Sequence, residues 1–162
     1  FKPAMVVTST LLCFYWYKNN LLVNYFKNIN SKNNNFMVFG VLSAAFLLVH
    51  SIFLGIKTDI ETLKFLKRVV LVGFILFEII AQSLLIFNFY KLKNELNNFL
   101  NPVILKLKIT LVSILIFVAI ICIPILIASG NTHLKHGLEW NYFLGIIIFY
   151  LLTKLLWKKK SL

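Results

Sequence analysis

Long apolar blocks separated by short polar breaks constrain this chain more than any other feature. The blocks are about 20 residues long, and a helix of that length spans about 30 Å, the thickness of a bilayer's hydrocarbon core. The breaks between them are rich in lysine and asparagine. Hydrophobic residues make up 60% of the 162 residues, against roughly 45–50% in a soluble domain. The sequence therefore predicts an all-α fold, a polytopic transmembrane helix bundle.

We predict about five spans, which together form a single transmembrane domain over residues 1–162. The first apolar block is short and residue 1 is Phe rather than Met, so we expect the start of the protein to lie upstream. We interpret residues 18–35 as an interfacial loop or a short surface helix. Asn101 followed by Pro102 is typical of a helix N-terminus, so we predict that the fourth helix begins there. The predicted spans are residues 3–17, 36–56, 69–90, 109–128 and 138–157.

The formal net charge of +12 does not indicate nucleic-acid binding. The cations lie in the polar breaks and at span ends, where they reach anionic headgroups, so we expect membrane lipids and no nucleic acid as partners. With five spans, ten lysines fall on the side of the C-terminus and six lysines or arginines on the other. The positive-inside rule then predicts a multi-pass protein with a cytoplasmic C-terminus.

Small residues at spacings of four and seven mark one face of the second span. Gly40, Ala44, Ser51 and Gly55 fall on this face, and small residues let helix backbones approach closely in lipid. The face therefore predicts a helix-packing surface.

Glu78 is the acidic residue deepest in a predicted span, and a carboxylate there costs at least a few kcal/mol. Gln82, one turn later on the same face, is its nearest expected partner, with His50 and Ser113 as partners on other spans. Two interpretations remain open. Glu78 either serves as a proton or substrate relay or as the polar anchor of a ligand pocket, or it forms an interhelical hydrogen bond that fixes packing. We expect it to be protonated.

Three histidines and one glutamate form a second candidate cluster. His133, His136 and Glu139 would share a helical face at the entry to the fifth span, and His50 would lie on the same, non-cytoplasmic side. Such groups suit a divalent metal or acid–base work on a lipid headgroup. They equally suit a polar membrane interface. No nucleophile or metalloprotease motif accompanies them, so we expect no catalytic residue, no metal and no cofactor.

The segment Glu139-Trp140, Phe143 and Phe149-Tyr150-Leu151-Leu152-Thr153 resembles the last span of the DRAM family of autophagy modulators and their relatives in GPI-anchor remodelling. The resemblance implies a six-span protein of which the first span is missing here. It also implies a cytoplasmic tail and a non-enzymatic, membrane-organising or lipid-linked role.

These observations favour a non-catalytic integral membrane protein, a subunit or accessory component that packs against other membrane proteins or lipids. The alternative is a lipid-active enzyme or small transporter that uses Glu78 together with His50, His136 and Glu139. The two differ in whether the polar groups meet at a hydrated cavity or serve packing.

Overall fold

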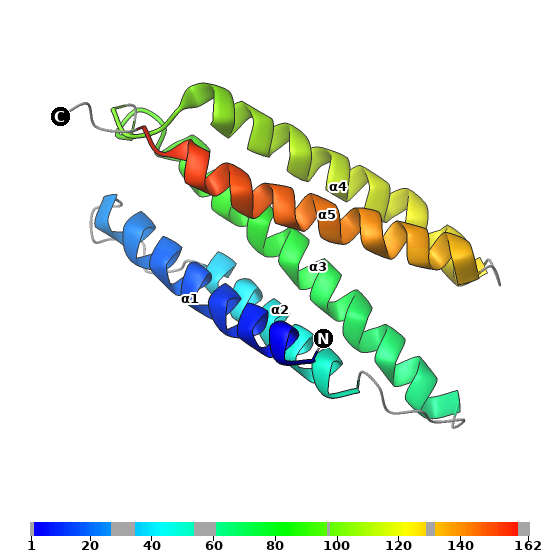
Figure 1. Ribbon diagram of the computed structural model, residues 1–162. Coiled ribbons are helices and arrows are strands. Elements are labelled where there is room, and N and C mark those ends of the chain that lie inside the picture. Colours follow the sequence, from blue (N-terminus) through cyan, green and yellow to red (C-terminus); the bar gives the residue numbers. More distant parts are fainter. Residues whose placement is uncertain (1, 27–34, 54–60, 97, 129–131, 159–162) are drawn as a thin grey trace. The chain divides into compact units, whose positions relative to one another are not determined.

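The computed structural model describes residues 2–26, 35–53, 61–96, 98–128 and 132–158; at positions 64, 122–128, 132–136 and 138–139 it describes the backbone alone. The described chain is helical and has no strand beyond an isolated bridge between Leu100 and Trp157. Its helices are α1 (Lys2–Phe26), α2 (Asn35–Phe53), α3 (Glu61–Lys91), α4 (Pro102–Ala128) and α5 (Thr132–Leu156) (Figure 1).

Three of the described helical segments are long and apolar enough to cross a membrane. They are Asn35–Phe53, Glu61–Lys91 and Pro102–Ile121, and Trp140–Leu156 is a shorter apolar helix. The predicted start of the fourth helix is confirmed, because α4 begins at Pro102 and the Val103 amide donates to Asn101 Oδ1 at 3.1 Å. This side-chain cap satisfies an amide that has no partner within the helix.

Helix α1 is longer than the sequence pattern suggests. It continues through residues 18–26, part of the segment that we interpreted as an interfacial loop or a short surface helix. The reason is a single buried face that runs past the predicted end of the span at spacings of three and four residues. The buried residues on this face are Ser9, Leu12, Trp16, Asn19 and Val23.

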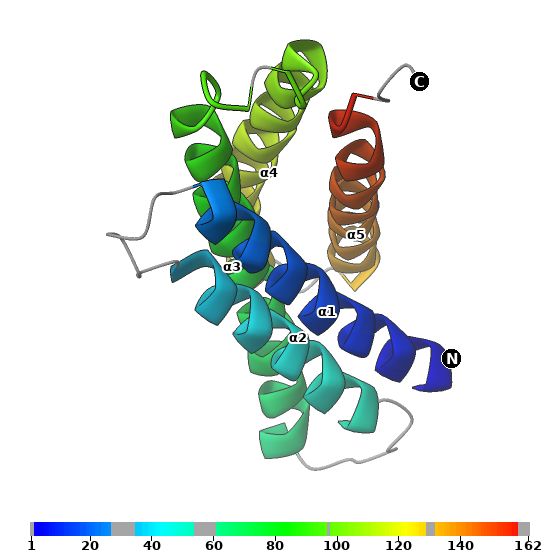
Figure 2. The ribbon, with the colours of Figure 1, turned by 90° about the vertical axis from the view of Figure 1, so that its left-hand side faces the viewer.

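The chain forms two compact units, Phe1–Asn88 (unit 1) and Phe89–Leu162 (unit 2), and α3 runs from the first into the second. In unit 1, α1 and α2 lie side by side (Figures 1 and 2). Ser9 Oγ donates to the carbonyl of Ala44 at 2.7 Å, and Trp16 lies against Phe36, so the two helices are antiparallel.

Aromatic side chains join α2 to α3 within unit 1. The rings of Phe39 and Phe77 are stacked with centroids 6.1 Å apart, and Phe46 lies 5.2 Å from Phe77. Phe46 also lies over Gly73, where a Cβ would come within 2.7 Å of the ring. The glycine therefore makes room for the ring at this crossing.

Unit 2 is built on the antiparallel pair α4 and α5. Leu115 of α4 occupies the space beside Gly145 of α5, where a Cβ would lie 2.6 Å from the leucine side chain. Just beyond the end of α5, Trp157 meets Phe89 of α3 edge to face with centroids 6.2 Å apart.

Candidate functional site: two buried polar clusters

Glu78 lies on the buried face of α3. Val70, Phe74, Gln82 and Leu85 lie three or four residues from one another or from Glu78 along the helix, and all are buried. Side chains at these spacings share one helical face. The face that packs inside the protein therefore carries the carboxyl group, and the Glu78 side chain is 0% exposed.

Both carboxyl oxygens of Glu78 have partners inside unit 1. Gln82 Nε2 donates to Oε1 at 2.9 Å, and the hydroxyl of Ser43, from α2, lies 2.6 Å from Oε2. The Ser43 hydroxyl also lies 2.8 Å from the carbonyl oxygen of Gly40. We call Glu78, Ser43 and Gln82 the Glu78 cluster. The cluster joins α2 to α3. Burial of the Glu78 carboxyl group would be unfavourable without these hydrogen-bonding partners.

The predicted small-residue face of α2 lies inside unit 1. Gly40, Ala44 and Ser51 are all buried, whereas Gly55 lies outside the described residues. The indole of Trp16 packs directly on Gly40, in the space that a Cβ would occupy. The face thus accommodates a bulky aromatic side chain of α1.

The histidine cluster is described only in part. His50 is half-buried near the end of α2. His133, His136 and Glu139 belong to the first turns of α5, but their side chains lie outside the described set. Among the side chains that are described, no group of three His, Cys, Asp or Glu residues has the arrangement of a metal site.

Unit 2 contains a second buried polar cluster, which we did not predict from the sequence. Lys108 is 0% exposed, although it lies on an apolar helix. Its ammonium donates to the hydroxyl of Thr153, on α5, at 2.6 Å and lies 3.8 Å from the centre of the Phe149 ring. Thr153 in turn donates to the carbonyl oxygen of Phe149 at 3.1 Å. We call Lys108, Thr153 and Phe149 the Lys108 cluster.

The Lys108 cluster holds a cation with a hydroxyl and an aromatic face. No carboxylate of the described residues forms an ion pair with Lys108, and its interactions are those with Thr153 and Phe149. A cation over an aromatic ring gains about 0.5–2 kcal/mol, more when both are desolvated. The cluster therefore ties α4 to α5, as the Glu78 cluster ties α2 to α3.

A sequence signal for Lys108 exists in hindsight. Leu105, Lys108, Val112 and Leu115 follow spacings of three and four, and all four are buried. Lys108 thus occupies a position that an apolar residue normally takes in such a face. We placed it outside the fourth span because lysines near helix ends usually extend toward the headgroups.

No family model, no curated protein and no solved structure matches the chain.

Proposed function

We propose that the chain is a multi-pass membrane protein with a non-catalytic role, a subunit or accessory component that packs against lipids and other membrane proteins. Three apolar helices of spanning length support the membrane assignment. We further propose that α1 and α5 also cross the bilayer, which gives five spans in one membrane domain.

The Glu78 cluster is the observation that carries the non-catalytic role. A carboxyl group that works as a relay needs a route to water or substrate, whereas this one is fully buried with a partner on each oxygen. A surface depression beside the start of α3 is lined by residues from Glu61 to Arg68. Arg68 precedes Glu78 by ten residues, or about 15 Å along the helix. Glu78 is therefore best understood as a polar anchor between α2 and α3.

Exposed apolar side chains support the proposal that lipids and other membrane proteins are the partners of the chain. On α5, Leu144, Ile147, Leu151 and Leu155 are each more than half exposed, and they form one stripe at spacings of three and four residues. Soluble monomers rarely expose continuous apolar patches of this kind. The stripe fits acyl chains or the apolar face of a partner helix.

The distribution of charges supports the orientation that we propose. We propose a cytoplasmic C-terminus, because ten of the chain's lysines fall on that side in the five-span arrangement. Burial of Lys108 removes one of them from the surface. The remaining excess still favours the cytoplasmic assignment under the positive-inside rule.

Extraction and sizing of the native protein test this proposal. The chain should stay with membranes during alkaline carbonate washing, and in mild detergent it should migrate in a discrete assembly with other membrane proteins. Release by carbonate would contradict the membrane assignment. Migration as a single chain, together with an activity that Glu78→Gln abolishes without loss of the fold, would instead favour the transporter or lipid-active alternative.

A further inference from the structure

One end of unit 2 concentrates positive charge. The exposed lysines there come from the end of α3, the connector between α3 and α4, the first turns of α4 and the end of α5. Glu95 is the one acidic residue among the described residues at this end. We call these lysines the basic end of unit 2; they are Lys91, Lys93, Lys106, Lys154 and Lys158.

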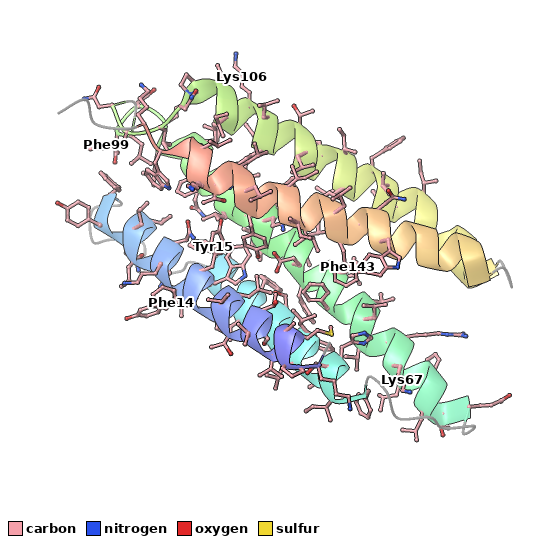
Figure 3. All side chains as sticks on the ribbon, in the orientation of Figure 1. Phe14, Tyr15, Lys67, Phe99, Lys106 and Phe143 are labelled. Carbon is pink, nitrogen blue, oxygen red and sulfur yellow. The ribbon has the colours of Figure 1, made fainter. Side chains whose placement is uncertain are left out.

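Backbone hydrogen bonds hold these segments together. The Asn101 amide donates to the carbonyl of Leu156 at 2.8 Å, and the Lys158 amide donates to the carbonyl of Phe99 at 2.8 Å. Buried Leu96 and Leu100 anchor the connector beneath them. Lysines that are distant in the sequence are therefore presented at one end of a defined structure, and Figure 3 shows Lys106 and Phe99 near this end.

Exposed apolar side chains lie directly beside the lysines. On α4, Val103 and Leu107 are 62% and 49% exposed and flank Lys106. On α5, Leu155 is 58% exposed and follows Lys154. A soluble anion would use the charges alone, whereas a phospholipid has both a phosphate for the lysines and acyl chains for the leucines.

Aromatic side chains complete the same end. Tyr90 and Phe99 are 51% and 43% exposed, and the Lys93 ammonium lies 4.6 Å from the centre of the Tyr90 ring. Half-buried Trp157 lies at the end of α5. Such rings concentrate at the headgroup level of membranes.

We propose that the basic end of unit 2 binds the headgroups of anionic phospholipids. The inference rests on the proposed membrane role and adds a specific lipid class and its site. Clusters of about 4–8 lysines or arginines beside a membrane helix are sufficient for this recognition, each contributing about a threefold to fivefold gain in affinity near the surface. Lys108 takes no part, because its ammonium is buried against Thr153 and Phe149.

The test uses the full chain in nanodiscs of phosphatidylcholine with a minor fraction of phosphatidylglycerol, and native mass spectrometry counts the retained lipids. The test variant is Lys106→Gln/Lys154→Gln/Lys158→Gln. The control, Lys2→Gln/Lys18→Gln/Arg68→Gln, removes three exposed cations from unit 1 and so changes the net charge equally. We expect the wild type and the control to enrich phosphatidylglycerol to the same extent. The test variant should lose most of this enrichment, because three lysines at about threefold to fivefold each contribute roughly 27-fold to 125-fold together.

Several results would overturn the site. The first is no enrichment of phosphatidylglycerol by the wild type, and the second is an equal loss of enrichment in both triple variants. The third is displacement of the lipid by millimolar glycerol phosphate, which would indicate a site for soluble anions. If the test variant misfolds, the wild type is measured at about 0.5 M salt instead, because screening must abolish an electrostatic preference for phosphatidylglycerol. A preference that does not depend on salt would contradict the lipid site. If the chain inserts into nanodiscs but does not enrich phosphatidylglycerol, only the lipid site is refuted. If it fails to insert even into nanodiscs of pure phosphatidylcholine, the membrane role is refuted as well.

Discussion

The indole of Trp16 fills the space beside Gly40, where any larger residue would place its Cβ. Trp16 is 0% exposed, and its ring also lies 6.3 Å from that of Phe36. The contact is one of shape, and it adds to the Ser9–Ala44 hydrogen bond that also joins α1 and α2. The absence of a side chain at residue 40 is therefore a requirement of the packing.

Substitutions on α2 should follow this asymmetry. We expect Gly40→Leu and Ala44→Leu to destabilise the protein by about 1–3 kcal/mol, because an overpacked interface forces the helices apart. Ala45→Leu is a matched control, since Ala45 is exposed next to buried Ala44. Thermal unfolding in detergent, followed by circular dichroism, measures the difference. Equal stabilities of Ala44→Leu and Ala45→Leu would refute a packing role for this face.

Substitution of Glu78 should separate the hydrogen bonds from the charge. Glu78→Gln keeps an acceptor for Gln82 and a polar group beside Ser43, so we expect folding within about 1 kcal/mol of wild type. Glu78→Leu leaves the buried Gln82 amide without its acceptor, which costs about 1–3 kcal/mol. Denaturation of the two variants in the same detergent decides the point. A destabilisation of Glu78→Gln as large as that of Glu78→Leu would show that the carboxyl group itself is required.

The Ser43 hydroxyl predicts the protonation state of Glu78. A hydroxyl has one proton, yet Ser43 Oγ lies within hydrogen-bonding distance of both Gly40 O and Glu78 Oε2. A proton on Glu78 satisfies both contacts, because Ser43 then donates to Gly40 and accepts from the carboxyl group. Infrared spectroscopy at neutral pH should show a protonated carboxyl band that disappears in Glu78→Gln. A spectrum with carboxylate bands alone would disprove the proton on Glu78.

The Lys108 cluster should behave as a coupled pair. Thr153→Val removes the hydroxyl that accepts from the ammonium, and we expect a loss of about 1–3 kcal/mol. Lys108→Met keeps an unbranched side chain of similar length and removes the buried polar group, so it should be neutral or stabilising. In the double variant the threonine substitution should have little further effect. Additive stabilities of the two single variants would show that the contact has no energetic role.

Cysteine labelling tests the orientation. In a background of Cys13→Ser and Cys122→Ser, an impermeant maleimide should label Gly137→Cys on intact cells, because Gly137 is exposed with nothing within 4 Å of its added Cβ. Ser161→Cys, in the lysine-rich tail, should react only after the cells are permeabilised. The reverse pattern would place the C-terminus outside the cytoplasm.

The apolar blocks predicted where helices form, because helix formation in such blocks depends on local composition and length. The N-terminus of α4 was also predictable from Asn101 and Pro102, because a cap is a local interaction. The partners of Glu78 were predictable only in part. Gln82 is one turn away on the same helix, so spacing identifies it, whereas Ser43 is 35 residues away. Its place opposite Glu78 depends on the register between α2 and α3.

The boundaries of the buried faces were harder to predict than the helices. Composition alone would place both Lys108, two turns into α4, and Asn19, just beyond Tyr17, at a membrane–water interface. Lys108 and Asn19 are nevertheless buried. Each lies on a helical face whose other residues are buried. The tertiary contacts that Phe149, Thr153 and Trp16 make at these faces outweigh the preference of the two polar side chains for water.

The backbone hydrogen bonds between the connector and the end of α5 can form only late in the synthesis of the chain. Asn101 and Phe99 are made long before Leu156 and Lys158, the residues that supply their hydrogen-bonding partners. At about 5–20 residues per second of translation, the connector waits several seconds for the end of α5. Until then it is open to chaperones, proteases and incorrect helix pairing. A chain released before residue 156 would therefore lack the partners of both hydrogen bonds, and its connector could not close.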